Sequence, residues 1–345
     1  MIHSPALRVG IIGSNYGLAH IAPLRAAGAT VVALAGRDPS KTATLAAQHQ
    51  IALATTDIDQ LCQAVDAVVI ASPDGLHHQH VLQVLGHGRH ILCEKPLTRT
   101  ASDAEALVAA AAQAKVVCAT AFAYRHIGVL RQLHNWLRQR PAPHWLSISV
   151  ANSFASAEGF NHHRDGPLMG QSGDFGGVSH LLDASLWLMA GEPRWLQALL
   201  VGRPCHSIGL QLMLNHGGVV HLNQFVGHEP GIHGHWQLAG EGWEVRFNAA
   251  YLPGLHSWRL GPIQCWQQGQ WQPLAPQVEA GPSQAEPWFE GNLGTARAFL
   301  AAIGGQPQHR DDLVSFADAA RVQRLFAAAI ASEQQGQRIW LAPQP

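Results

Sequence analysis

A glycine-containing turn near the N-terminus is the first segment whose residues could support chemistry. Residues 8–17 read Arg-Val-Gly-Ile-Ile-Gly-Ser-Asn-Tyr-Gly, an apolar run followed by Gly13 and Gly17. A dinucleotide pyrophosphate needs such a turn, because backbone N–H groups must approach it at the start of a helix, which we expect near Leu18. Asn15 replaces a second glycine, and asparagine tolerates positive φ better than most residues. We therefore predict cofactor binding by Gly13, Ser14, Asn15, Tyr16 and Gly17, the alternative being a simple tight turn.

The end of the second apolar run indicates which cofactor binds. An acidic residue at that position would bind the ribose hydroxyls of NAD, but this sequence has Gly36 there. Arg37, with Ser40 and Lys41 nearby, could bind a 2′-phosphate. We therefore favour NADP(H) over NAD(H), the alternative being that Arg37 and Lys41 are solvated loop charges.

Two more polar segments follow later apolar runs. Ser72, Pro73 and His77 follow one, and Glu94 and Lys95 follow the next. Ligands bind at the carboxyl ends of parallel strands, so we expect all five at the cofactor site. A lysine there can transfer a proton or orient a substrate hydroxyl.

The elements that position these residues alternate between strand and helix over the first ~120 residues. Short β-branched runs suit strands buried on both faces of a parallel sheet. The stretches between them have helical periodicity, and Asp38-Pro39 and Thr100 mark two helix starts. The predicted strands are Leu7–Ile12, Thr30–Ala35, Ala67–Ala71, His90–Cys93 and Val116–Ala119.

The pattern changes after Tyr124. A helix is expected over 126–140, an antiparallel strand over Trp145–Val150, a helix near 179–190 and several strands between 194 and 275. Segment 267–287 is expected to be an exposed loop, and helices follow near 289–303 and 313–333. We therefore predict an α/β protein with a Rossmann domain at 1–123. An α+β domain with an open, mostly antiparallel sheet follows at 124–345, and its last helix could pack back on the first domain.

Composition excludes several classes of protein. The chain of 345 residues has a formal net charge of −1 and 13% charged residues, so neither a basic nucleic-acid surface nor a disordered chain is indicated. It has no apolar run long enough to cross a membrane and no signal-peptide pattern at its start. Five widely spaced cysteines favour reduced thiols and a cytoplasmic location. Adjacent histidines do not share a face in a strand and have no partners at metal spacing, so we expect no metal.

Taken together, these segments resemble the glucose–fructose oxidoreductase/inositol dehydrogenase (Gfo/Idh/MocA) family. The resemblance rests on the turn at 9–17 with His20, on 67–73 with His77, and on Gly88-Arg-His-Ile-Leu-Cys-Glu-Lys-Pro-Leu97. Residues 179–191 resemble the helix that carries the family's active-site histidine, and the C-terminal segment 316–341 also fits.

The resemblance implies a Rossmann domain that binds a nicotinamide cofactor. It also implies that Lys95 and His180 flank a substrate carbinol and transfer the proton that accompanies hydride transfer. The expected substrate is a sugar, a polyol or a related small hydroxy or keto compound. The resemblance further implies a homodimer or homotetramer formed through the C-terminal sheet.

The sequence departs from the family pattern near His180. Many members carry an aspartate four residues before the histidine, where this chain has Gly176. Asp183 lies three residues after His180 on the same helical face, and Asp174 could reach the site from a loop. We count both as candidate catalytic residues. Tyr124 and Arg125 are candidate substrate contacts, with a purely structural role as the alternative.

Two other functions are also compatible with these residues. The changes at Asn15 and Gly176 would also suit a member that binds cofactor for regulation without turnover. Lyase or glycosidase chemistry that recycles a bound NAD is the other alternative.

Overall fold

The computed structural model describes residues 6–152, 176–201, 207–229, 231–251, 258–274, 289–306 and 313–342. Contacts divide the chain into two compact units, Met1–His126 with Phe289–Gln323, and Ile127–Trp288 with Arg324–Pro345. The sequence suggested two consecutive domains, whereas the first unit also takes in a segment from near the C-terminus.

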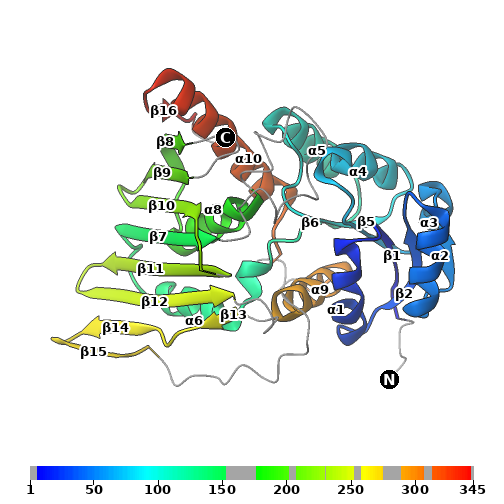
Figure 1. Cartoon of the computed structure of the whole chain (residues 1–345), viewed down its shortest axis with the longest axis horizontal. Coiled ribbons are helices and arrows are strands. Elements are labelled where there is room, and N and C mark those ends of the chain that lie inside the picture. The colour runs from blue at the N-terminus through cyan, green and yellow to red at the C-terminus, as the bar shows by residue number, and fades with distance from the viewer. Residues whose placement is uncertain are drawn as a thin grey trace. The chain divides into compact units, whose positions relative to one another are not determined.

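A six-stranded parallel sheet forms the centre of the first unit, with strand order β3-β2-β1-β4-β5-β6 (Figure 1). This order places the topological switch point between β1 and β4, where open α/β sheets bind ligands. The predicted runs appear as strands, and sequence reading missed only β3, an edge strand of three residues. The strands are β1 (Arg8–Ile12), β2 (Thr30–Ala35), β3 (Leu53–Thr55), β4 (Ala67–Ile70), β5 (His90–Cys93) and β6 (Cys118–Thr120).

Helices cover both faces of this sheet, and their starts follow local capping. Asp38 accepts a hydrogen bond from the N–H of Lys41, and Thr100 accepts one from Asp103, so both predicted helix starts are confirmed. The helices between the strands are α1 (Ile21–Ala26), α2 (Pro39–Gln48), α3 (Ile58–Ala64), α4 (His77–Gly86) and α5 (Ala101–Gln113).

The helix expected from Leu18 begins differently. A 3₁₀ helix, η1 (Tyr16–His20), precedes α1, and Asn15 has φ −117°. A continuous α-helix from Leu18 would place the ring of Pro23 against the carbonyl of Ala19, which explains the tighter first turn. Asn15 therefore needs no positive φ, contrary to the sequence argument.

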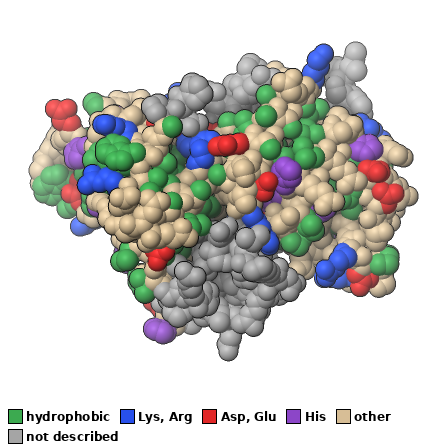
Figure 2. All heavy atoms as spheres, turned by 90° about the horizontal axis from the view of Figure 1, so that it is seen from above, with side chains coloured by type: hydrophobic (Ala, Val, Ile, Leu, Met, Phe, Trp, Pro, Cys, Tyr) green, Lys and Arg blue, Asp and Glu red, His purple; other side chains and the backbone are tan. Residues whose placement is uncertain are grey.

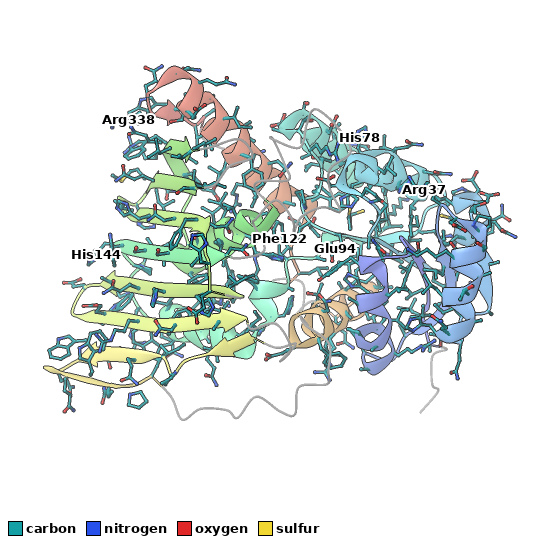
Figure 3. The ribbon with its side chains drawn as sticks, viewed as in Figure 1. Arg37, His78, Glu94, Phe122, His144 and Arg338 are labelled. Atoms are coloured by element: carbon teal, nitrogen blue, oxygen red, sulfur yellow. The ribbon has the colours of Figure 1, made fainter. Side chains whose placement is uncertain are left out.

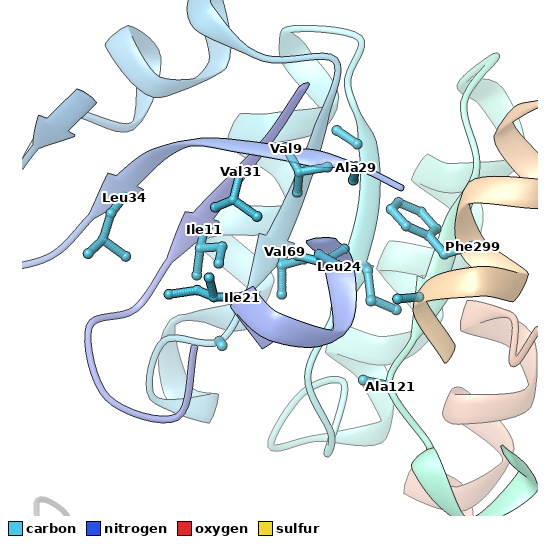
Figure 4. Close-up of a cluster of buried hydrophobic side chains, with 14 of the residues drawn as sticks. Val9, Ile11, Ile21, Leu24, Ala29, Val31, Leu34, Val69, Ala121 and Phe299 are labelled. Atoms are coloured by element: carbon cyan, nitrogen blue, oxygen red, sulfur yellow. The ribbon is translucent and has the colours of Figure 1, made fainter. Parts of the chain in front are cut away.

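One hydrophobic core explains why a distant segment joins the first unit (Figure 4). Val9 and Ile11 of β1 pack with Leu24 of α1 and with Phe299 of α9 (Phe289–Ile303). Phe299 has no exposed surface, so α9 completes a layer that the first 126 residues leave open. On the opposite face, a Cβ at Gly10 would meet Leu61 of α3, and α4 and α5 continue that layer.

The start of α10 (Phe316–Gln335) also belongs to the first unit. The N–H of Thr120 donates to the carbonyl of Val314 at 2.8 Å, and the Gln323 amide donates to the carbonyl of Thr98. These contacts join the segment around Val314 and the first turns of α10 to the first unit.

The second unit is built on a larger mixed sheet of order β15-β14-β12-β11-β7-β10-β9-β8-β16 (Figure 1), and β13 also pairs with β12. The expected antiparallel strand becomes β7, which is antiparallel to β11 but parallel to β10. The predicted loop at 267–287 is corrected in part, because β15 lies within it. The strands are β7 (Trp145–Asn152), β8 (Pro193–Val201), β9 (Ser207–Leu214), β10 (Val219–Val226), β11 (Ile232–Gly240), β12 (Trp243–Tyr251), β13 (Trp258–Leu260), β14 (Gln264–Gln267), β15 (Gln270–Pro273) and β16 (Ile339–Trp340).

The two faces of this sheet differ in burial. Residues such as Leu146, Ile148 and Leu222 are fully buried on the face that packs against α8 (Gly176–Met189), which itself contacts α6 (Gly128–Leu137). Alternate residues point to the other face, where polar side chains and several exposed apolar ones lie. The structure thus confirms the predicted fold class, a parallel Rossmann sheet with a second, mostly antiparallel sheet.

Candidate active site

The glycine turn passes very close to the end of β4. Gly13 has φ +121°, and a Cβ there would collide with the carbonyl of Ala71. The N–H of Gly13 donates to Ala35 at 2.9 Å, and a Cβ at Gly17 would lie 2.8 Å from Ile11. Only glycine fits at either position. The backbone of the turn therefore lies at the switch point without side chains in front of it. This arrangement fits the close approach of a dinucleotide.

The end of β2 adjoins this turn. A Cβ at Gly36 would collide with the Thr42 hydroxyl and lie 3.1 Å from the Ser14 hydroxyl, so an acidic side chain has no room there. Arg37 is exposed just beyond Gly36 (Figure 3). Lys41 is also exposed, and its Nζ lies 3.4 Å from the Asn15 amide oxygen.

Asp38 occupies part of the same region. It accepts hydrogen bonds from the Ser40 hydroxyl at 2.8 Å and from the Lys41 N–H at 3.0 Å. These bonds, the one from the Lys41 N–H first, lower the pKa of Asp38. The Ser40 hydroxyl therefore helps to cap α2 in this structure.

The turns after β4 and β5 are joined by several hydrogen bonds. The buried His77 ring lies 2.9 Å from the carbonyls of both Ser72 and Pro96. Asp74 and Arg99 form a salt bridge at 2.8 Å between the same turns. These contacts join the Ser72 segment after β4 to the Lys95 segment after β5.

Glu94 supports the turn that carries Lys95. Its Oε1 lies 2.8 Å from Nε2 of His20, and its Oε2 accepts the N–H of Lys95 at 3.1 Å. Burial would raise the pKa of Glu94, but the bond and charge of His20 and the charge of Lys95 outweigh it and lower the pKa. The side chains of Glu94 and His20 are almost completely buried. Glu94 therefore holds the backbone of the Lys95 turn in a fixed position.

Lys95 itself is partly exposed at the carboxyl end of the sheet. Burial lowers the pKa of Lys95 below the usual 10.5, while the negative charges of Glu94 and Asp74 raise it in part. A lysine with a lowered pKa is better suited to take up and release a proton near neutral pH.

Tyr124 and Arg125 lie on a 3₁₀ helix, η3 (Ala123–His126), directly after β6. Both are buried, and burial raises the pKa of the Tyr124 phenol. Gly291 and Gly294 of α9 approach Ala123 and His126 so closely that a Cβ at either glycine would collide. These contacts pack α9 closely against η3.

The second unit supplies the predicted histidine. His180 and Asp183 lie on α8 with 6% and 1% exposure, three residues apart and so on one helical face. A Cβ at Gly177 would lie 3.2 Å from the Gln224 amide oxygen, which places buried Gln224 beside the start of α8. Asp174 lies outside the described residues.

Sequence reading missed several polar residues near these positions. Asp74, His80 and Arg99 all bond within the turns after β4 and β5. Gln224 and Asn152 are buried on the inner face of the second sheet. The alternation of apolar and polar residues within β7 and β10 could have indicated Asn152 and Gln224. Each is an amide at a position where the pattern predicts an apolar, buried side chain.

The described residues contain no group of three or more histidine, cysteine or acidic side chains placed to hold a metal ion. In the same part of the chain, no helix is both long and apolar enough to span a membrane. On the face drawn in Figure 2, basic and acidic side chains are interspersed.

Residues 7–122 match the model of the GFO_IDH_MocA oxidoreductase family, described by its NAD-binding Rossmann fold. The matched segment contains the glycine turn and the Lys95 turn. The likeness to that family covers the Rossmann domain of this chain. The resemblance inferred from the sequence is thus confirmed where its most specific motifs lie.

Individual relatives match part of the chain. Glucose-6-phosphate 3-dehydrogenase of Bacillus subtilis is 29% identical over 140 residues, which are 39% of this chain and 40% of the relative. An NADP(+)-dependent scyllo-inositol 2-dehydrogenase of the same species is 34% identical over 83 residues, 24% and 25% of the two chains. The chain thus spans two fifths or less of the length of these relatives.

A solved structure matches the whole length. Levoglucosan dehydrogenase in complex with NADH covers 99% of this chain and 100% of its own, with a TM-score of 0.79 and 20% identity. At that identity the likeness shows a shared fold, and it extends beyond the Rossmann domain to the residues of the second unit.

Proposed function

We propose that the chain is an NAD(P)-dependent dehydrogenase acting on a sugar, a polyol or a related hydroxy or keto compound. The observation that carries the proposal is the position of the glycine turn after β1 and of the Lys95 turn after β5, at the carboxyl ends of the two strands that flank β4. Both turns lie in the segment that matches an oxidoreductase family. The names of the relatives, which act on sugar phosphates, inositol and levoglucosan, support this substrate class.

Residues 13–17 with Ser72 and Pro73 would hold the cofactor, whose nicotinamide supplies or accepts the hydride when bound. In alcohol oxidation, the neutral amine of Lys95 takes the proton of the substrate hydroxyl; in reduction, its ammonium returns that proton. His180 shares this role, with Asp183 or Asp174 orienting its ring. Tyr124 and Arg125 are proposed to contact substrate.

NADP(H) is the proposed cofactor. The lack of room for an acidic side chain at Gly36 and the exposed cations of Arg37 and Lys41 support it. The relatives named above include both an NADP(+)-dependent enzyme and an NADH complex, so they favour neither form.

The outer face of the second sheet is proposed to join copies of the chain into a homodimer or homotetramer. It exposes Leu199, Val201, Phe225, Trp266 and Trp340. The cytoplasm is the proposed location, because the four described cysteines are free thiols.

Replacement of Lys95 tests the dehydrogenase proposal. Lys95→Ala should lower kcat by about 10²–10⁴-fold on any substrate found by screening with sugars and polyols. Cofactor binding, followed by nicotinamide fluorescence, should change little. Lys115→Ala, which removes an exposed lysine, is the matched control.

Full activity of Lys95→Ala would contradict the role of Lys95. Tight cofactor binding without turnover across the screen would instead favour the regulatory alternative.

A further inference from the structure

His77 has a hydrogen-bonding arrangement that constrains its charge. It is the first residue of α4 and is 1% exposed. Its Nδ1 lies 2.9 Å from the carbonyl oxygen of Pro96, and its Nε2 lies 2.9 Å from that of Ser72. Both partners are backbone carbonyls, which can only accept hydrogen bonds.

A neutral imidazole has one N–H, so it can donate to only one of these carbonyls. Its second nitrogen would then direct a lone pair at a carbonyl oxygen 2.9 Å away, in a site closed to water. A buried polar atom without a proper partner costs about 1–3 kcal/mol, and direct repulsion adds to this. An imidazolium donates from both nitrogens and satisfies both carbonyls.

We propose that His77 is held as an imidazolium and acts as a positioning residue that ties the Lys95-Pro96 turn to the turn after β4. The two carbonyls belong to the segments that follow β4 and β5. We call His77 and its two carbonyl partners, Ser72 and Pro96, the clamp. The clamp fixes the backbone on the C-terminal side of Lys95, while Glu94 and His20 fix it on the N-terminal side.

The charges on the surrounding turns bear on this protonated state. The carboxylates of Asp74 and Glu94 favour it, whereas Lys95, Arg99 and the start of α4 oppose it. His80, one turn along α4, has its Nδ1 2.9 Å from the Ser72 hydroxyl. Burial and the charge of His77 lower the pKa of His80, so His80 is the neutral member of the two.

Nitrogen NMR of the cofactor-free protein with ¹⁵N-labelled histidine tests the proposal directly. At pH 7.5, both ring nitrogens of His77 should carry a proton, each with a one-bond N–H coupling. The signal is assigned as the one lost in His77→Gln and kept in His78→Gln, which replaces the neighbouring, partly exposed histidine (Figure 3). A neutral ring with one N–H would overturn the proposal.

If His77→Gln does not fold, neutron diffraction from crystals of the unaltered protein locates both ring hydrogens. Two hydrogens support the clamp, and one overturns it.

The positioning role rests on the proposed function of Lys95 and is measured by kinetics. His77→Gln should lower kcat by roughly 10- to 100-fold, because small displacements of a reacting group are costly, while the KM for cofactor changes little. His78→Gln should alter neither. An unchanged kcat with a raised KM would overturn the positioning role.

The two proposals fail separately. If Lys95→Ala stays active while His77 carries two ring protons, the function assigned to Lys95 is wrong and the charged clamp stands. If Lys95→Ala is inactive while His77 is neutral, the clamp is wrong and the function stands.

Discussion

Gly36 and Arg37 are the residues on which the proposed preference for NADP(H) rests. Arg37→Ala should weaken NADPH binding by roughly 10- to 100-fold, since hydrogen bonds to a charged group contribute about 1.5–3 kcal/mol. NADH binding should change little, because NADH has no 2′-phosphate. Calorimetric titration of both cofactors measures the difference, with Arg138→Ala, an exposed arginine of the second unit, as the control. A preference for NADH that Arg37→Ala leaves unchanged would contradict the assignment.

His20 and Glu94 form a buried, hydrogen-bonded pair behind the Lys95 turn. His20→Ala leaves the Glu94 carboxylate buried without its main partner, which should cost about 3–5 kcal/mol of unfolding free energy in urea denaturation. The double variant with Glu94→Gln should recover part of that loss, because no charge is then left buried. His87→Ala, which removes an exposed pair with Asp59 at 2.9 Å, should have a much smaller effect.

The pair also predicts a dependence of stability on pH. The pKa of Glu94 is lower in the folded chain than its usual 4.5, so its contribution is fully present above pH 4.5. It should be lost as the pH falls through the folded value, and Glu94→Gln should reduce that loss. An equal acid sensitivity in both proteins would count against the buried pair.

At the level of elements, α9 is the helix whose place the sequence did not indicate. Phe299→Ala should lower the unfolding free energy of the first unit by about 3–5 kcal/mol, because a fully buried ring would leave a cavity against β1 and α1. Leu82→Ala, which removes a side chain of the same unit that is 41% exposed, should lower it far less. Thermal unfolding followed by circular dichroism compares the two. Equal effects would show that α9 does not complete the core.

At the level of the whole molecule, the proposed assembly of copies depends on the outer face of the second sheet. Leu199 is 66% exposed on β8, and an exposed apolar residue of this size suits an interface. Leu199→Asp should shift the protein to a smaller species in size-exclusion chromatography with light scattering. Leu82→Asp, at an exposed leucine on α4 of the first unit, should not. A monomeric starting protein would refute the proposed assembly.

The sequence alone determined the parallel sheet, the helix caps and the two turns that carry Gly13 and Lys95. These features depend on local patterns, since β-branched runs, Asp38-Pro39 and a tight glycine turn each specify their structure within a few residues. The same patterns placed Lys95 and Ser72 at one sheet edge, because parallel neighbouring strands end together. The sequence also carried enough of the family motifs for the Rossmann domain to be assigned.

Only the tertiary structure showed that α9 and the start of α10 belong to the first unit, and that β7 lies parallel to β10. Both depend on contacts between residues far apart in the chain, which no local pattern encodes. The same holds for the His20–Glu94 pair and for the contact of His77 with the carbonyl of Pro96, whose partners are 74 and 19 positions apart. The sequence supplied the chemical groups, and the packing of the strands decided which of them meet.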